Sequence, residues 1–362
     1  MNTHLFVLPF LHFGVGRLAV DLMRVVRSGG STVVAVTCGW MGDPGDDAAM
    51  IDECTAAGVI VEHADVFSRD PDVMRESART LSDVCSRWKP VVAHAFTAVS
   101  AAAVRDCPLV ASNVGWSPSK AAWQRAMDAE ILEGCAVVTA VSAAVASELA
   151  AAGLRRPARL ILHGVPVGPL RAPARQRIAT LGAVAHLIPR KGVDVLLEAL
   201  TLLPRGTFDR LRIAGEGESA SDLRRFADTA TLACDVDWCG HVAIDAFLPT
   251  IDALVIPSRS DALPLVLLNA MAAGVPIVAS RTGGIPEALA PGEGWLVEPD
   301  EAGGLAAALA DLAGRPGEAR ARAESAYAHA RRSFSFERMA AEYAECYAAA
   351  RAVTPGAALH RR

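Results

Sequence analysis

The sequence predicts an α/β protein with two Rossmann-like, doubly wound parallel-sheet domains. Short apolar runs alternate with longer amphipathic segments along the chain, which is typical of successive β-α-β units. The alternation restarts after a segment rich in Pro and Arg, residues 165–178, where we expect a hinge. The length of 362 residues suits two domains, and the hydrophobic fraction of 52% supplies a core for each.

In the first half, apolar runs predict strands at residues 4–9, 32–37, 91–95, 109–112 and 136–140. Gly14 and Gly16 are predicted to form a loop between the first strand and its helix. Asp70 precedes a proline and a helical pattern, so it is expected to cap that helix. Ser142 is expected to cap another helix.

In the second half, strands are predicted at residues 178–186, 211–214, 236–240, 253–257, 276–279 and 295–297, with a helix at 193–203. The stretch PSRSDALPLVLLNAMAAGVPIVAS, residues 257–280, predicts a loop, a helix with Pro264 at its first position, and a buried strand. Asn269 interrupts the apolar helix, and Asp261 precedes it by eight residues. Ligands of such sheets bind beyond the carboxyl ends of the strands, so we expect a site in the cleft that the two domains face.

Composition argues against several classes of protein. The net charge is −5 and the only basic block is the tail His360-Arg361-Arg362, so nucleic-acid binding is not expected. The eight cysteines form no Cys-x-x-Cys pair, which favours free thiols in a reducing cytosol over zinc or disulfides. The apolar N-terminus lacks the basic flank of a signal peptide, and no uninterrupted apolar run reaches ~18 residues. We therefore expect a cytoplasmic protein, with peripheral membrane contact left open.

Several segments, in order, resemble the retaining glycosyltransferases of family 4, which have the GT-B fold. They are VVTAVSAAVASELAAAGL (137–154), ILHGVPVGPL (161–170), LGAVAHLIPRKGVDVLLEAL (181–200), LPLVLLNAMAAGVPIVASRTGGIPEAL (263–289) and FSFERMAAEYAECY (334–347). The second resembles a hinge that usually reads Asn-Gly-Val-Asp. The resemblance implies an acceptor-binding domain at 1–165, joined by a C-terminal helix at about 335–352, and a donor-binding domain at 178–334.

The resemblance also implies a donor site with departures from the family pattern. Two family glutamates, one for the sugar hydroxyls and one for the ribose, correspond here to Asp261 and Asn269. The amide of an asparagine can accept and donate hydrogen bonds, but it cannot make the charge-assisted hydrogen bond that a glutamate carboxylate would make. The alternative is that Asn269 only interrupts an apolar face. Leu263 and Pro264 open the same signature and are counted as donor-binding positions.

The family's diphosphate clamp, an Arg and a Lys five residues apart, corresponds to His186 and Lys191. His186 would be a weaker clamp, because an imidazole is mostly neutral near pH 7. The alternatives are a solvated loop lysine and a hydrogen-bonded histidine at a strand end.

The acceptor side is less defined. Gly14 and Gly16, which are counted among the donor-binding positions, match a glycine-rich loop that brings backbone amides toward phosphate at a helix N-terminus, where they would contact donor or acceptor; the alternative is a simple turn. The family commonly has a histidine after the strand 109–112, where this chain has Asn113 nearby. His94 is one residue out of register with another family position, which favours a core histidine over a catalytic one. His12 is an equally open candidate.

The resemblance implies metal-independent transfer, with retention, from a nucleotide diphosphate sugar to an acceptor hydroxyl. A UDP-sugar is the first choice of donor, and a natural product, a lipid-linked glycan or a cell-envelope glycan could be the acceptor. No Asp-x-Asp motif stands where a divalent cation would be held. The alternatives are a catalytically weakened homologue that assists another glycosyltransferase and a sugar-phosphate enzyme of the same fold.

Overall fold

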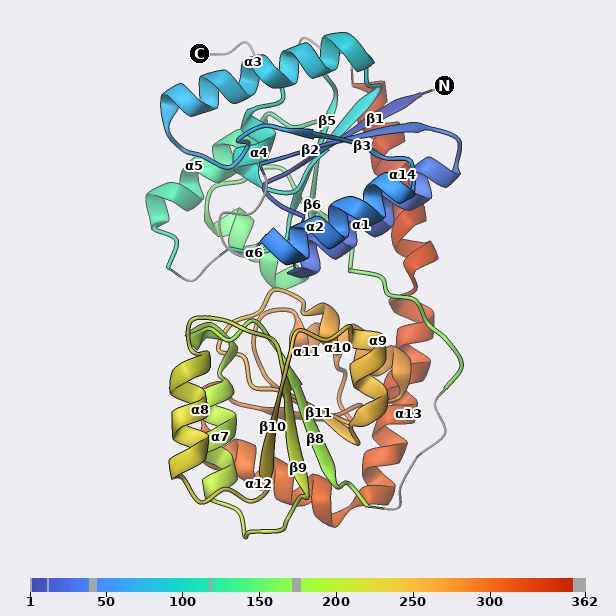
Figure 1. The fold of residues 1–362 in the computed structure, drawn as a ribbon. Helices are drawn as coiled ribbons and strands as arrows, with labels where there is room; N and C mark the ends of the chain where they lie inside the picture. The colour runs from blue at the N-terminus through green and yellow to red at the C-terminus, as the bar shows by residue number, and fades with distance from the viewer. Residues whose placement is uncertain (1, 12, 39–43, 117–118, 171–176, 354–362) are drawn as a thin grey trace. The chain divides into compact units, whose positions relative to one another are not determined.

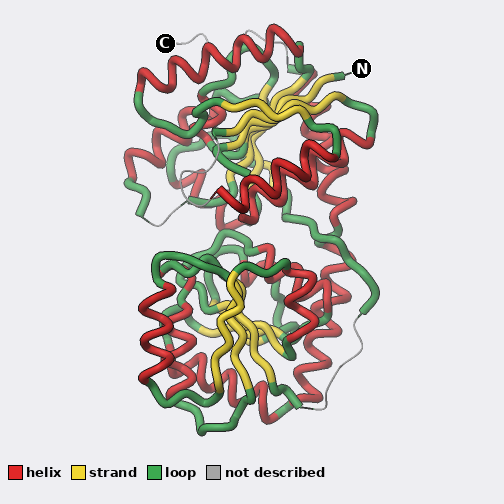
Figure 2. Tube along the Cα trace, viewed as in Figure 1, coloured by secondary structure: helices red, strands yellow, loops and turns green. Residues whose placement is uncertain are grey.

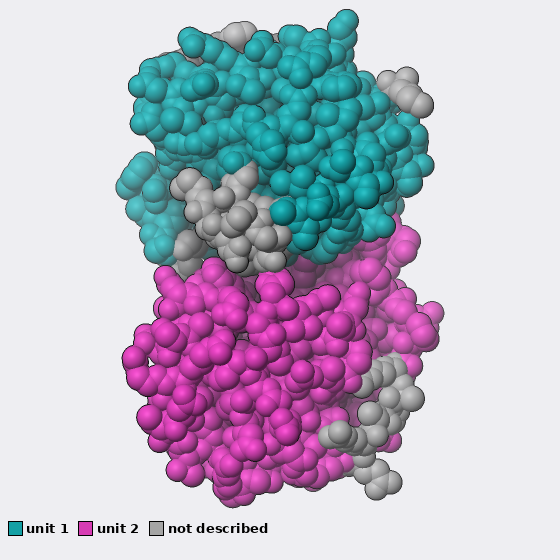
Figure 3. All heavy atoms as spheres, in the orientation of Figure 1, with its two compact units in different colours: residues 1–162, 339–362 teal, residues 163–338 magenta. Residues whose placement is uncertain are grey.

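The computed structural model describes residues 2–11, 13–38, 44–116, 119–170 and 177–353. The chain divides into two compact units, coloured separately in Figure 3. Unit 1 comprises Met1–Leu162 and Met339–Arg362, and unit 2 comprises His163–Arg338. Each unit contains one parallel sheet, which confirms the predicted fold class. The segment 165–178, predicted as a hinge, falls within unit 2.

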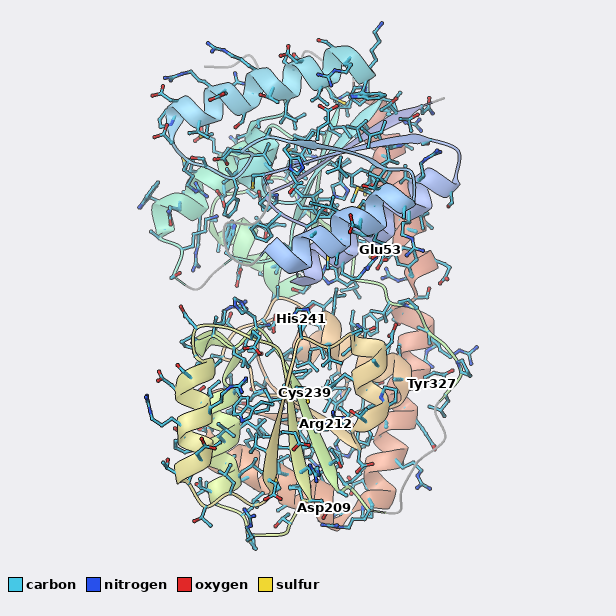
Figure 4. All side chains as sticks on the ribbon, viewed as in Figure 1. Glu53, Asp209, Arg212, Cys239, His241 and Tyr327 are labelled. Atoms are coloured by element: carbon cyan, nitrogen blue, oxygen red, sulfur yellow. The ribbon has the colours of Figure 1, made fainter. Side chains whose placement is uncertain are left out.

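Unit 1 is built on a seven-stranded sheet with the order β3-β2-β1-β4-β5-β6-β7, flanked by helices (Figures 1 and 2). The strands are β1 (Thr3–Leu8), β2 (Thr32–Thr37), β3 (Ile60–His63), β4 (Val92–Ala95), β5 (Leu109–Asn113), β6 (Val137–Ala140) and β7 (Arg159–Leu160). The helices are α1 (Phe13–Ser28), α2 (Pro44–Ala56), α3 (Pro71–Trp88), α4 (Ala98–Ala102), α5 (Ala122–Glu133), α6 (Ala143–Ala151) and α14 (Phe336–Ala352), of which all but the first residues of α14 belong to this unit. Arg17 of α1 donates to Glu53 of α2 at 2.7 and 2.9 Å (Figure 4).

Local sequence signals account for several of these boundaries. All six residues of β1 are buried, as expected of a strand inside a parallel sheet. The predicted caps are confirmed: the Asp70 carboxylate accepts from the Asp72 and Val73 amides, and the Ser142 hydroxyl accepts from the Val145 amide.

The predicted loop at Gly14 and Gly16 is wrong, because α1 already begins at Phe13 and both glycines lie in its first turn. A Cβ atom on Gly16 would lie 2.6 Å from the carbonyl carbon of Leu11. Glycine therefore allows the helix to start directly against the end of β1. The turn still presents backbone amides, since the first four of a helix have no partner within it.

The C-terminal helix α14 is fastened to the sheet of unit 1 by a buried polar network. The ring of His94 on β4 is 1% exposed, and its Nδ1 and Nε2 lie 2.9 Å from the Tyr347 hydroxyl and 2.7 Å from the Ser112 hydroxyl. Ser112 also bonds to Thr139 at 2.7 Å and to Tyr343 at 3.1 Å. Burial lowers the pKa of His94 to about 3, so the ring is neutral.

We expect Tyr347→Phe to lower the free energy of unfolding by about 1–3 kcal/mol, because it leaves a buried nitrogen of His94 without a partner. The measurement is urea denaturation followed by circular dichroism. Tyr327→Phe is the matched control: its hydroxyl donates to the Gly168 carbonyl on an exposed site, so its loss should stay within about 0.5 kcal/mol (Figure 4). Equal effects of the two variants would contradict the role of the network.

Unit 2 is built on a six-stranded parallel sheet with the order β10-β9-β8-β11-β12-β13. The strands are β8 (Thr180–Val184), β9 (Arg210–Ala214), β10 (Asp235–Gly240), β11 (Ala253–Ile256), β12 (Ile277–Ser280) and β13 (Trp295–Val297). The helices are α7 (Val193–Thr201), α8 (Ala220–Thr229), α9 (Ile244–Phe247), α10 (Leu265–Ala273), α11 (Ile285–Ala288), α12 (Ala302–Gly314) and α13 (Pro316–Ser333), with short 3-10 turns η1 (Pro189–Lys191) and η2 (Leu248–Thr250). None of the described helices combines the length and apolarity that a membrane span requires.

The strand order places a topological switch point in unit 2. The first strand, β8, pairs with β9 on one side and with β11 on the other. The connections that leave β8 and β11 therefore diverge to opposite sides of the sheet, and a crevice opens beyond their carboxyl ends. The loops that follow these two strands are the natural place for a ligand in this unit.

Candidate functional site

Backbone and guanidinium contacts tie together the loops after β8 and β11. The Arg259 amide donates to the Arg190 carbonyl at 2.9 Å, and Arg190 Nη1 donates to the Ser260 carbonyl at 2.8 Å. The guanidinium of Arg259 also makes two bonds to the Asp194 carboxylate, at 2.9 and 2.7 Å. Bidentate contacts of this kind fix orientation as well as distance. The two loops thus form one rigid platform at the switch point.

Lys191 and Asp261 meet on this platform. Lys191 ends η1 and Asp261 lies in the loop before α10, yet Lys191 Nζ donates to Asp261 Oδ2 at 2.5 Å. The two side chains are only 17% and 11% exposed, and the Ser258 hydroxyl reaches the same oxygen at 3.3 Å. The residues predicted as phosphate clamp and sugar contact are therefore neighbours, although 70 residues separate them in the chain.

The helix α10 begins one residue later than predicted, so Pro264 is its N-cap residue and not its first residue. The side chains of Leu263 and Pro264 are buried and hold the start of the helix in place. Asn269 is half-buried, and its Nδ2 donates to the Leu265 carbonyl one turn earlier, at 2.8 Å. This bond uses the amide as a donor inside the helix and leaves Oδ1 as the group that could accept from a ligand hydroxyl.

The loop after β12 borders the same platform. The Gly284 amide donates to the Ala262 carbonyl at 2.7 Å, and Gly283 has φ +52 with its Cα against the Asp261 carbonyl. His186 lies half-buried beyond the end of β8, where its carbonyl accepts from the Ile188 amide at 2.8 Å. Contact of His186 with a diphosphate remains a prediction.

One residue near the platform was not singled out from the sequence. His163, in the segment compared with the family hinge, is only 5% exposed. Burial lowers its pKa to about 4, while a hydrogen bond with the backbone of Leu263 and the charge of Asp261 act in the opposite direction. The signal available in the sequence was a titratable residue in place of the usual asparagine of the hinge.

The acceptor-side candidates lie in unit 1. His94 belongs to the buried network described above, which fits the core-histidine alternative and leaves its ring no access to an acceptor. Asn113 ends β5 and is 6% exposed, and its Oδ1 accepts from the Gly115 amide at 2.8 Å. This bond closes a turn, so the local backbone structure accounts for an asparagine at this position. His12 lies outside the described residues.

Models of known protein families match both halves of the chain. Residues 14–168 match the family model described as Glycosyltransferase Family 4, and residues 175–315 match the model described as Glycosyl transferases group 1. The chain belongs to the family-4 glycosyltransferases. The two matched stretches fall on the predicted acceptor and donor halves, and the second contains the Lys191–Asp261 platform.

Curated relatives are similar to part of this chain. It is 31% identical over 166 residues to a GDP-mannose-dependent phosphatidylinositol monomannoside mannosyltransferase of Corynebacterium glutamicum, covering 43% of each chain. It is 35% identical over 180 residues to glycogen synthase of Mycobacterium tuberculosis, covering 48% of this chain and 43% of that one. The chain thus spans less than half the length of these two curated relatives.

The structure of Anabaena HepE in complex with UDP-glucose superposes with a TM-score of 0.81 at 19% identity, covering 96% of this chain and 100% of HepE. Sucrose-phosphate synthase from Thermosynechococcus elongatus gives a TM-score of 0.79 at 16% identity, covering 96% and 98%. At such identities the likeness concerns the fold, and it confirms the GT-B architecture.

Proposed function

We propose that this protein transfers a sugar from a nucleotide diphosphate sugar to an acceptor hydroxyl, with retention of anomeric configuration and without a metal ion. The observation that carries the proposal is the Lys191–Asp261 pair on the platform at the switch point of unit 2. A cation and a carboxylate side by side match the two ends of the donor. The diphosphate would bind the cation, and the sugar hydroxyls would donate to the carboxylate.

Catalysis then requires stabilisation of the diphosphate as it leaves. Lys191 supplies a fixed positive charge where negative charge develops, which is the role that preorganised charges play in enzymes. The acceptor hydroxyl attacks from the face that the diphosphate leaves, and the diphosphate oxygen takes its proton. Positioning of the two substrates contributes more on this route than a protein base does.

The donor nucleotide is proposed by analogy with the relatives. HepE was crystallised with UDP-glucose, and the Corynebacterium relative is named for GDP-mannose. We propose a UDP-sugar first and a GDP-sugar second. For the acceptor we propose a hydroxyl of a natural product, a lipid-linked glycan or a cell-envelope glycan.

Calorimetry with UDP, GDP, ADP, dTDP and CDP, each with and without magnesium, tests the donor proposal. Selective binding of one nucleotide, unchanged by magnesium, is the expected result, followed by turnover of the matching sugar in which proton NMR shows the anomeric configuration of the product. Binding without turnover would favour the helper alternative. Failure of all five nucleotides to bind would reject the donor proposal in favour of a nucleotide-free sugar phosphate.

The ribose contact proposed for Asn269 yields a separate prediction. Asn269→Glu should tighten binding of the preferred nucleotide about fivefold, because a charged acceptor strengthens a hydrogen bond by roughly 1 kcal/mol. Asn269→Gln is the matched control, since it lengthens the side chain equally without adding charge. If Glu weakens binding as much as Gln does, Asn269 does not face the ribose.

A further inference from the structure

A cationic cluster in unit 1, formed by Arg69, Lys120 and Asp128, takes no part in the proposed donor site. Arg69 lies in the connection from β3 to α3, and Lys120 lies in the connection from β5 to α5. Both bind the carboxylate of Asp128 on α5: Arg69 Nη2 donates to Oδ1 at 2.7 Å, and Lys120 Nζ donates to Oδ2. The side chain of Asp128 is 2% exposed, whereas those of Arg69 and Lys120 are 26% and 18% exposed. The two cations therefore reach solvent while the carboxylate between them does not.

The cationic cluster carries more positive charge than a structural ion pair needs. One cation would neutralise Asp128, so two cations leave a net charge of +1. Arg125 brings a further cation close, because its Nε donates to the Lys120 carbonyl at 3.1 Å. Burial lowers the pKa of Lys120, and the positive charges of Arg69 and Arg125 lower it too, while the hydrogen bond to Asp128 raises it. Cations held together in a partly buried place repel one another, and a bound anion would relieve that repulsion.

The side chains around the cluster offer both donors and an apolar surface. Arg69 contacts Asp128 through Nη2, and its Nη1 has no hydrogen-bond partner among the residues that the structure describes. The guanidinium thus retains a donor that Asp128 does not use. The ring of Trp116 lies beside the same cations, with its centroid 5.6 Å from Lys120 Nζ and 5.8 Å from the guanidinium carbon of Arg125. Apolar and aromatic surface with a few convergent polar groups is typical of a small-molecule site.

The cluster also lies where ligands bind in sheets of this kind. Both connections leave the carboxyl ends of parallel strands, which is the edge that carries the ligand sites of doubly wound sheets. A second carboxylate in the first connection, Asp65, is turned to its own loop, where its Oδ1 accepts from the amides of Phe67 and Ser68 at 3.1 and 3.0 Å. It is engaged by the backbone and does not pair with the cations of the cluster.

We propose that the acceptor is a phosphate ester, whose phosphate binds Arg69 and Lys120 and whose carbon skeleton lies against Trp116. The planar fork of an arginine matches the oxygens of a phosphate, and a lysine adds a point charge. A phosphate monoester carries a charge of about −1.5 to −2 near pH 7, which balances the excess of the cluster better than a single carboxylate would. The assignment of this phosphate to the acceptor rests on the proposed function. The phosphate site in unit 1 does not rest on it.

The chain contains only three lysines, Lys89, Lys120 and Lys191, which allows a direct test. In protein labelled with carbon-13 lysine, NMR resolves the ε-methylene signals, and the loss of each signal in the corresponding Lys→Met variant assigns it. Glycerol 3-phosphate should shift the Lys120 signal to saturation, glycerol should not shift it, and the exposed Lys89 should respond to neither. UDP should shift Lys191 and leave Lys120 in place.

The same spectra separate the two proposals. A Lys120 signal that glycerol 3-phosphate does not move would overturn the phosphate site. A Lys120 signal that UDP moves as much as glycerol 3-phosphate does would give the cluster to the donor and overturn its assignment to the acceptor. If no nucleotide moves Lys191, the donor proposal fails, and the response of Lys120 still decides whether unit 1 binds a phosphate ester.

Arg69→Met tests the second cation with the same signal. It should weaken the binding of glycerol 3-phosphate about tenfold or more, because a hydrogen bond between charged groups is lost. Lys120 still pairs with Asp128 in this variant, so unit 1 should fold. Arg79→Met is the matched control, since Arg79 is exposed on α3, and its affinity should stay within about twofold of the wild type. Equal affinities of the two variants would overturn the site.

Two sources of the phosphate ester share this chemistry: a lipid headgroup and a soluble sugar or polyol phosphate. Sedimentation with vesicles of phosphatidylglycerol, against vesicles of phosphatidylcholine, distinguishes them once glycerol 3-phosphate has moved Lys120. Binding of the wild type to phosphatidylglycerol that is lost in Lys120→Met and kept in Lys89→Met would place the phosphate in a lipid. Equal sedimentation of the wild type and Lys120→Met would place it in a soluble acceptor.

Discussion

Lys191→Met should lower kcat/KM with the donor sugar by about 100- to 1,000-fold, the usual effect of removing one preorganised group that stabilises developing charge. Methionine keeps most of the length and apolar body of the side chain, so the loss reports the charge. Turnover of the nucleotide sugar identified by calorimetry is the measurement. The effect should appear mainly in kcat if Lys191 stabilises the departing diphosphate more than the bound donor.

Lys89→Met serves as the control for the loss of a positive charge. Lys89 is exposed on unit 1, at the end of α3. Its replacement should leave kcat/KM within about twofold of the wild-type value, because exposed charges are screened by solvent and salt. A fall of less than tenfold in Lys191→Met would show that another group neutralises the diphosphate.

Gly283→Ala should both destabilise unit 2 and weaken donor binding. An added Cβ would lie 1.6 Å from the Asp261 carbonyl oxygen, at a φ of +52 that side chains disfavour. Together, the left-handed conformation and the forced displacement should cost about 2–5 kcal/mol. Because the displaced atom belongs to Asp261, nucleotide affinity should fall by at least about tenfold.

Gly292→Ala separates the cost of the positive φ from the cost of displacing the Asp261 carbonyl. Gly292 also has a positive φ, +85, but an added Cβ there would meet nothing within 4 Å. It should cost only the conformational part, about 1–2 kcal/mol, and leave nucleotide binding unchanged. Thermal unfolding and calorimetry of both variants are the measurements. If the two variants show equal destabilisation and equal nucleotide affinity, the loop that contains Asp261 moves aside at no cost to stability or binding.

Local chemistry determined which parts of the fold were predictable. The caps at Asp70 and Ser142 depend on a side chain and the backbone two or three residues on, so the sequence alone reveals them. The region that contains α2 and β3 was not predicted. β3 has four residues, at the edge of the sheet, and none is fully buried. An edge strand of this kind lacks the continuous apolar run by which the inner strands were found.

The candidate site, too, was predictable from the sequence only in part. Asp261 and Lys191 were expected in one site because of the resemblance, but their direct pairing follows from β8 and β11 being neighbours in the sheet, which no local pattern encodes. His163 escaped notice because its burial is a property of the folded chain that no local pattern in the sequence encodes. Tertiary packing created the unusual environment, so only the structure could reveal it.

The division of unit 1 between the two ends of the described chain has a consequence for biosynthesis. A ribosome completes all of unit 2 before it delivers Tyr343 and Tyr347, which pair with Ser112 and His94. Until α14 emerges, the sheet of unit 1 carries unsatisfied polar groups and an uncovered apolar surface. Unit 2, although second in sequence, can therefore reach its final packing first, and unit 1 closes last.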